Sequence, residues 1–356
     1  MRTKILPVLI LFFITAPSAK ADIALDPVAE EIRTNFESQL FTLEPYLQRH
    51  YALRLYRITG DEKYIYPIIS DLMIIANLIE KDARGLNSPV HRKAREAIIL
   101  DRFNLTKEKH LKRFTLLKAQ PGMAFSLALL ANLTMVNEVG LLNSYFFDTT
   151  DHIVAYLREQ QFETFFLNPD VVKIYSPQLA TYVYFLFDLG IVDLRQRFTE
   201  VFKRVFVSTD DHRLSDLIYA QKLYGMTHFI IGASRNYQRT VNRNEFDWIY
   251  DYFEKNIDSI VRRAKADIVA EVGIAFLLAG ESNHPAVAAA RKAVRQRYDP
   301  VHRLIPSTSG STELSGGEHR NVLAIMLLTW SGQLYPGPNL SRSPQYESFW
   351  LKDYLP

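Results

Sequence analysis

Residues Asp267–Gly280 read DIVAEVGIAFLLAG, an apolar stretch of helical length in which Glu271 is the one charge between Ile268 and Gly280. A helix that is apolar on all sides is normally buried, whereas an amphipathic helix lies at the surface. Five further segments also carry few charges and many small or aromatic residues: His50–Gly60, Gly122–Val136, Ser176–Gly190, Ser215–Ser234 and Arg320–Gly332. Together these six segments predict the buried helices of the protein.

Charged, amphipathic stretches alternate with the buried segments, and extra elements fit in residues 81–117. Their apolar residues recur every three or four positions, which favours helices over strands. The stretches are Glu62–Lys81, Asp151–Thr164, Leu194–Val207, Asn244–Lys265 and Pro285–Tyr298. No Ser/Pro-rich linker interrupts the chain, so we expect a single all-α domain over residues 22–356. Alternating inner and outer helices predict a closed (α/α) toroid of about six helical hairpins, and an open solenoid of hairpins is the alternative.

The chain begins with the features of a secretory signal peptide. Arg2 and Lys4 precede the apolar run Ile5–Ile14, and Ala19-Lys20-Ala21 is a cleavage site of the A-x-A type. The run is shorter than the about 20 apolar residues that cross a membrane. We therefore expect residues 1–21 to be removed. The mature chain would then have no integral membrane segment and would act in the periplasm or as a secreted protein.

Composition excludes several classes of site. The 42 basic and 39 acidic residues become balanced once Arg2, Lys4 and Lys20 leave with the signal peptide. A neutral mature chain gives no reason to expect nucleic acid, since that affinity rests on neutralising phosphates. The sequence contains no cysteine, which excludes disulfides and zinc sites built on thiolates.

Two resemblances add to this interpretation. The stretch Leu53–Tyr64 (LRLYRITGDEKY) ends one helix at Gly60 and starts the next at Asp61, as expected for a left-handed glycine cap followed by an Asp N-cap. This pattern resembles the (α/α)6 toroid of carbohydrate-active enzymes. The segments Tyr224–His228 (YGMTH) and Gly316–Arg320 (GGEHR) resemble an uncharacterised family of exported bacterial proteins, a domain of unknown function, which implies no activity.

Polar side chains inside the apolar segments are the candidates for chemistry. A buried carboxylate such as Glu271 costs several kcal/mol unless it is paired, so we expect it to meet a partner, a ligand or a cavity. Burial also favours a raised pKa in the general-acid range; the alternative is a structural ion pair with Arg54. Tyr224 and His228 lie four residues apart and share one helix face. The alternative for His228 is a core histidine bonded to a hydroxyl or carbonyl group.

A loop rich in small residues, Ser307–Gly317, leads into Glu318, His319 and Arg320. Its glycines allow a close approach of backbone to ligand, and a helix start there would offer N–H groups to an anion. The alternative is a flexible connector. Weaker candidates are His50 and Arg54 in the first buried segment, and Asp211, for which helix capping is the alternative.

These residues lead to one hypothesis with an alternative. The hypothesis is an exported glycan-active enzyme, a hydrolase or a lyase, that binds an oligosaccharide or polysaccharide and uses no cofactor. The proposed catalytic residues are Glu271, His228, Tyr224 and His319, and the proposed substrate-binding residues are Arg54, His50, Arg320, Glu318 and Asp211, with the arginines as anchors for a sugar acid. The alternative is a non-catalytic exported glycan-binding or interaction protein.

Reaction type and metal use remain open at this point. A hydrolase would need a second carboxylate facing Glu271, such as Glu318 or Asp211. A lyase would pair a Tyr or His base with an arginine. A metal ion could draw ligands from His228, His319, Glu271 and Asp267, but their spacing does not require one, and no metal site is assigned.

Overall fold

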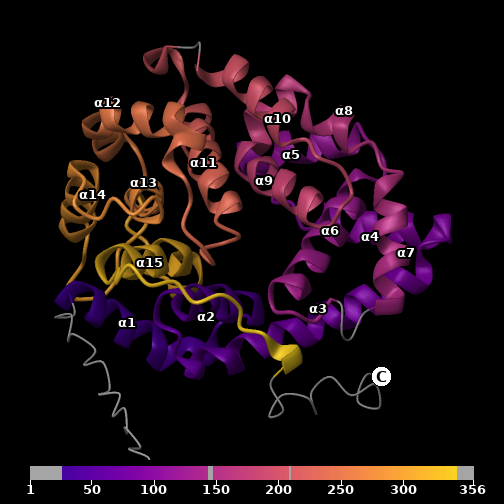
Figure 1. Ribbon diagram of the computed structural model, residues 1–356, viewed down its shortest axis with the longest axis horizontal. Coiled ribbons are helices and arrows are strands. Elements are labelled where there is room, and N and C mark those ends of the chain that lie inside the picture. The colour runs from indigo at the N-terminus through magenta and orange to yellow at the C-terminus, as the bar shows by residue number, and fades with distance from the viewer. Residues whose placement is uncertain (1–25, 143–146, 208–209, 343–356) are drawn as a thin grey trace, which may run out of the picture.

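The protein is all-helical in the parts that the structure, a computed structural model, describes: residues 26–142, 147–207 and 210–342 (Figure 1). These ranges contain fifteen α-helices and no strand, only one isolated bridge between Asp299 and Leu304. The predicted all-α class is therefore confirmed. The expected signal peptide, residues 1–21, lies outside the described residues.

Each of the six apolar segments corresponds to a helix, and most residues of these helices are buried. They are α2 (Pro45–Thr59), α6 (Met123–Glu138), α9 (Pro169–Asp188), α11 (Asp216–Ala233), α13 (Ala266–Leu278) and α15 (Leu314–Leu328). Helix α13 has every residue from Ile268 to Leu278 buried, as its uninterrupted apolar sequence predicts.

The remaining helices cover these six. They are α1 (Pro27–Gln39), α3 (Ile65–Gly85), α4 (Pro89–Asp101), α5 (Glu108–Lys118), α7 (Phe147–Arg158), α8 (Phe162–Phe166), α10 (Arg195–Phe202), α12 (Asp247–Arg263) and α14 (Pro285–Gln296). Helices α4 and α5 are the extra elements expected within residues 81–117. Helix α12 shows the amphipathic pattern clearly, because Ile249, Phe253 and Ile260 are buried while its charged residues face outward.

The inner helices pack in chain order, with α3 lying between the first two of them. Helix α2 contacts α3, α3 contacts α6, α6 contacts α9, α9 contacts α11, α11 contacts α13, and α13 contacts α15. Helix α15 also packs on α2, so the last inner helix lies beside the first, as Figure 1 shows. This arrangement brings side chains from α2, α11, α13 and α15 within reach of one another.

The junction after α2 follows the sequence prediction. Gly60 adopts φ +66° and its N–H donates to the carbonyl oxygen of Tyr56, which closes the helix with a left-handed cap. Asp61 then accepts a hydrogen bond from the Lys63 N–H at the start of the 3-10 turn Glu62–Tyr64 that leads into α3.

The loop before α15 differs from the prediction. The helix starts at Leu314, so Glu318, His319 and Arg320 lie inside it rather than at its entrance. The carboxylate of Glu313 accepts from the Gly316 N–H and from the Ser315 hydroxyl. A side-chain carboxylate thus already binds the Gly316 N–H that the prediction offered to an anion.

Within the ranges that the structure describes, no single helix is long and apolar enough to cross a membrane. The bent pair α5 and α6, which meet at 106°, passes the same test by length and composition only.

Candidate functional site

Three polar side chains from two other helices converge on the carboxylate of Glu271 on α13. The Thr227 hydroxyl of α11 donates to Oε2 of Glu271 over 2.6 Å. Nε2 of His319 on α15 lies 3.4 Å from Oε1, and Nε2 of His228 on α11 lies 4.0 Å from the same oxygen. The structure thus brings together three of the four predicted catalytic residues.

A second carboxylate–histidine pair lies beside the first. Nδ1 of His50 on α2 is 2.8 Å from Oε1 and 2.7 Å from Oε2 of Glu318, which directly precedes His319 on α15. The imidazole rings of His50 and His319 are 5.2 Å apart. Glu271, His319, His50 and Glu318 therefore form one continuous cluster, and we call these four residues with His228 the histidine cluster.

Exposure is graded across the histidine cluster. The side chains of Glu271 and Glu318 are each 1% exposed, whereas those of His228, His50 and His319 are 26%, 27% and 38% exposed. The carboxylates lie behind imidazoles that stay partly accessible. This is the arrangement expected where buried charges orient and stabilise groups that meet a ligand.

The surroundings lower the pKa of both carboxylates, which favours their ionised form at neutral pH. Burial alone would raise the pKa of Glu271, but the hydrogen bond from His319, the attraction of His228 and His319 in their protonated forms, and the Thr227 hydroxyl bring that pKa below its ordinary value. Burial would also raise the pKa of Glu318, but His50 and Arg54 outweigh this effect and lower it. The expected raised pKa of Glu271 is therefore wrong, because the sequence did not show how many donors would surround the carboxylate.

Two histidines of the cluster are neutral near pH 7. Burial, with a further contribution from Arg54, lowers the pKa of His50 to about 4 although Glu318 opposes the change. Burial also lowers the pKa of His228 to about 4 against the attraction of Glu271. The Thr181 hydroxyl donates to the Pro177 carbonyl and so accepts from Nδ1 of His228 over 2.9 Å. Nε2 of His228 is then the basic nitrogen of the neutral ring.

Tyr224 lies beside the histidine cluster, on the same face of α11 as His228. Its ring meets that of His228 edge-on with centroids 6.4 Å apart, and its hydroxyl donates to Oδ2 of Asp267. Burial and the neighbouring carboxylates Asp267 and Glu271 raise the pKa of Tyr224 well above its ordinary value, so the phenol stays protonated. Asp267 lies in the first turn of α13 rather than at its N-cap, which is Lys265.

Sequence reasoning missed Lys109 on α5. Its ammonium group lies 5.8 Å from the centre of the Tyr224 ring. Burial, Arg113 and Lys265 lower its pKa to about 7, and Asp267 opposes the change. In the sequence this lysine stands in the charged run Lys107–Arg113, which resembles a solvated helix face, so no local signal indicated it.

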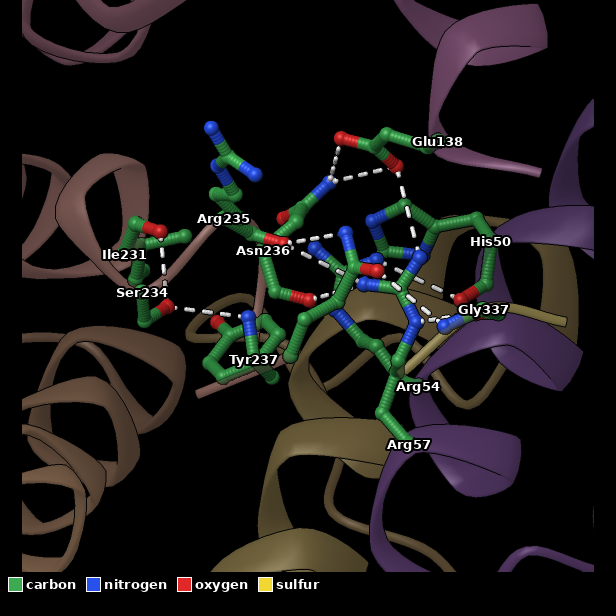
Figure 2. Close-up of polar contacts among 11 residues, drawn as sticks. His50, Arg54, Arg57, Glu138, Ile231, Ser234, Arg235, Asn236, Tyr237 and Gly337 are labelled. Atoms are coloured by element: carbon green, nitrogen blue, oxygen red, sulfur yellow. Dashed lines mark hydrogen bonds and ion pairs between the residues drawn. The ribbon is translucent and has the colours of Figure 1, made fainter. Parts of the chain in front are cut away.

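Arg54 borders the histidine cluster on α2 without pairing with Glu271. Its Nη1 donates to the backbone oxygen of His50 over 3.3 Å, and its guanidinium lies 5.7 Å from the centre of the Tyr237 ring. Figure 2 shows Arg54 beside His50 and Tyr237. Arg54 therefore does not form the structural ion pair with Glu271 that was the alternative from the sequence.

Arg57, one turn further along α2, forms a separate polar group that Figure 2 also shows. Its side chain is 0% exposed and donates to the carbonyl oxygens of Gly337 and Asn236, each over 2.5 Å. Glu138 lies 3.7 Å from its Nη2 and accepts from the Asn236 amide over 3.1 Å. We call Arg57, Glu138 and Asn236 the arginine cluster.

The other two predicted residues are held elsewhere. The Asp211 carboxylate binds the buried Lys222 over 2.7 Å and accepts from the Tyr252 hydroxyl over 2.5 Å. Arg320 donates to the backbone oxygens of Ile305 and Gly316 over 2.7 and 2.8 Å. Asp211 is therefore engaged in structural contacts, while Arg320 is fixed at the wall of a neighbouring pocket.

One group among the described residues has metal-ligand spacing: Glu254, Glu281 and His284. It is not the set suggested by the sequence. Arg243 binds Glu254 over 2.7 Å and Glu281 over 2.9 Å, and Nδ1 of His284 accepts the Ala286 N–H at the start of α14. The two carboxylates are thus already bound by Arg243, and Nδ1 of His284 already caps α14.

The model of a protein family described as a domain of unknown function (DUF3541) matches residues 25–352. The chain belongs to the DUF3541 family. No curated protein and no solved structure matches it. The match covers both the histidine cluster and the arginine cluster. A domain of unknown function assigns no chemistry to either cluster.

Proposed function

We propose that the protein is an exported glycan-active enzyme whose active site is the histidine cluster with Tyr224, and that it cleaves by elimination rather than hydrolysis. One observation supports this most: two buried, ionised glutamates stand behind partly exposed histidines that come from three helices. Ionisable groups that converge in this way with shifted pKa values are typical of active sites.

The ionisation states favour a lyase. A glycoside hydrolase needs one protonated carboxyl group as its acid, whereas Glu271 and Glu318 both have lowered pKa values. In an elimination, Nε2 of His228 takes the proton next to the carboxylate of a sugar acid. The electron pair of that C–H bond forms a C=C bond as the neighbouring C–O bond breaks. The phenol of Tyr224 protonates the leaving oxygen, and Glu271, 4.0 Å from His228, stabilises the imidazolium that forms.

A panel assay tests this function. Purified protein is incubated with acidic and neutral oligosaccharides, and both new reducing ends and new unsaturated sugar acids are measured. An elimination produces the two signals together. New reducing ends without unsaturation would mean hydrolysis and would overturn the lyase mechanism, while the absence of both signals across the panel would favour the non-catalytic binding protein.

The alternative binding function has its own discriminating measurement. The histidines and tyrosines of the site suit sugar contacts without turnover. A Glu271→Gln variant should keep oligosaccharide binding and lose turnover if the site is catalytic. If the unaltered protein binds a sugar tightly yet converts none of it, the binding function replaces the enzymatic one.

Two further proposals concern export and shape. Export predicts that the chain recovered from the periplasm or medium starts at Asp22, which intact mass measures directly. Packing of α15 on α2, with the His50–Glu318 contact between them, supports a closed toroid over an open solenoid. A compact chain of this length has a radius of gyration of about 20 Å, and a clearly larger value in small-angle X-ray scattering would favour the solenoid.

A further inference from the structure

A pocket of about 670 Å³ lies next to the histidine cluster, between the start of α13 and the chain leading into α15. Its lining includes five cationic side chains, Arg262, Arg263, Lys265, Arg297 and Arg320, and one carboxylate, Asp267. Ser307 and Thr308 add hydroxyl groups. Pockets of this size hold ligands as large as sugars, and this lining favours a negatively charged one.

Not all five cations are equally available to a ligand. Arg263 is already bound by Asp216 over 3.1 Å and by the backbone oxygens of Asp211 and Leu214. Arg262 and Lys265, in contrast, are exposed at the pocket wall. A ligand would therefore meet Arg262 and Lys265 before Arg263.

Arg297 and Arg320 are held in place by neutral acceptors. Nη2 of Arg297 donates to the Val261 oxygen over 2.6 Å, while its Nη1 is buried without a hydrogen-bond partner among the described residues. Arg320 is fixed through the carbonyl oxygens of Ile305 and Gly316. Carbonyl groups orient a guanidinium without cancelling its charge. A buried donor without a partner costs about 1–3 kcal/mol, which an anionic oxygen would offset.

Asp267 connects the pocket to the proposed catalytic residues. It lines the pocket and accepts the hydroxyl of Tyr224, whose ring meets that of His228. Its carboxylate also accepts from the Ile268 N–H over 3.1 Å. Asp267 and Tyr224 thus link a group bound among the arginines to the histidine cluster.

We propose that this pocket is a binding subsite for the carboxylate or sulfate group of a sugar adjacent to the one that is cleaved, so that the substrate is a polyanionic glycan. Arg297 and Arg320 provide guanidinium donors in the pocket lining, which suit both oxyanions, and Lys265 adds charge at the entrance. The proposal rests on the proposed function and deepens it.

Calorimetric titration tests the subsite with matched ligands. The intact protein is titrated with an oligogalacturonate and its methyl ester, and with a sulfated glycan oligomer and its desulfated form. We expect one charged ligand to bind at least tenfold more tightly than its neutral form, and which of the two does so identifies the oxyanion. Equal affinity within both pairs would overturn the proposal.

Variants locate the binding. Arg297→Gln and Lys265→Gln should each weaken binding of the preferred ligand roughly tenfold or more. The exposed Arg84→Gln on α3 is the matched control and should leave the Kd unchanged. Arg297 also binds the Val261 oxygen, so its variant needs an unchanged thermal midpoint, whereas Lys265→Gln carries no such requirement. If both pocket variants bind like the unaltered protein, the subsite is elsewhere.

The subsite and the enzymatic function fail in different ways. Charge-dependent binding that Lys265→Gln weakens, without turnover of any glycan, supports the subsite and rejects catalysis. Turnover with equal KM for charged and neutral forms, unaffected by Lys265→Gln, rejects the subsite and keeps catalysis.

Discussion

Helix α2 carries two polar clusters about two turns apart, and they differ in what their charges face. Arg57 of the arginine cluster is fully buried, and its guanidinium is bound mainly by backbone oxygens from distant segments. His50 of the histidine cluster is bound by one buried carboxylate and keeps part of its ring accessible. A buried charge enclosed by the backbone holds the chain together, whereas one behind accessible rings is available for chemistry.

Backbone conformation around Arg57 supports this distinction. Arg235, Asn236 and Tyr237 all have positive φ, between 52° and 68°, which costs of order 1 kcal/mol each outside glycine. Arg57 holds this segment by donating to the carbonyl oxygens of Arg235 and Asn236. The arginine cluster therefore stabilises the strained turn that places Tyr237 beside Arg54.

The largest effect is expected from Arg57→Met. It leaves Glu138 buried beside no cation and removes the donors to Gly337 and Asn236, so the free energy of unfolding should fall by about 3–5 kcal/mol. Urea denaturation measures the change. The control is Arg84→Met, since Arg84 is 74% exposed and its loss should cost about 0.5 kcal/mol or less. Equal effects of the two substitutions would show that the arginine cluster does not hold the fold.

The second prediction separates the two clusters by activity. Glu271→Gln should lower turnover of a cleaved glycan roughly 10²- to 10⁴-fold, because no charge then stabilises the imidazolium of His228. Its Kd and far-UV circular dichroism should stay unchanged.

Glu138→Gln is the matched control, since it alters a buried carboxylate of the arginine cluster. It should lower the free energy of unfolding by about 1–3 kcal/mol and leave turnover per folded molecule unaltered. A turnover loss in Glu138→Gln as deep as in Glu271→Gln would remove the distinction between the clusters.

Local signals in the sequence account for the parts that were predicted well. Gly60 and Asp61 mark a helix junction through local contacts. The Gly60 N–H closes α2 in the left-handed conformation, and the Asp61 carboxylate accepts from an N–H two residues later. His228 and Glu271 were proposed as rare polar residues in apolar helices, and they lie 4.0 Å apart. His319 was proposed from the loop before it and lies 3.4 Å from Glu271. The family membership was also confirmed.

What failed depended on neighbours distant in the chain. The pKa of Glu271 is lowered because Thr227, His228 and His319 surround it, and only the packing of α11, α13 and α15 sets that number of donors. Lys109 belongs to the site because α5 lies against it, although its own sequence reads as a surface face. The cap by Glu313 moved the start of α15 because a carboxylate three residues before Gly316 reached its N–H.

The third prediction concerns acid. His50 and His228 are neutral in the folded protein down to about pH 4, whereas in the unfolded chain they take up protons below about pH 6.5. The unfolded state therefore binds more protons between these values, and stability is lost as the pH falls through this window, by about 2 kcal/mol for each histidine at pH 5.

Urea midpoints at pH 7 and pH 5 measure this loss. His50→Gln and His228→Gln should each reduce the difference between the two midpoints, while substitution of the exposed His152 should not change it. A difference that both variants leave intact would show that the histidine cluster is not the origin of the acid sensitivity.

The smallest effect is expected at the end of α2, where the C-terminal segment packs on the helix next to the arginine cluster. Gly60→Ala should lower the free energy of unfolding by about 2 kcal/mol, because φ +66° disfavours alanine and a Cβ would lie 2.5 Å from the Tyr335 ring. Gly280→Ala, at φ +80° with no atom within 4 Å, should cost about 1 kcal/mol. Since the N–H of Tyr335 donates to the Arg57 oxygen over 2.9 Å, the gap between the two variants measures how firmly this segment is held. Equal losses in the two variants would mean that the ring of Tyr335 moves aside freely. The arginine cluster would then hold α2 without support from the packing of Tyr335.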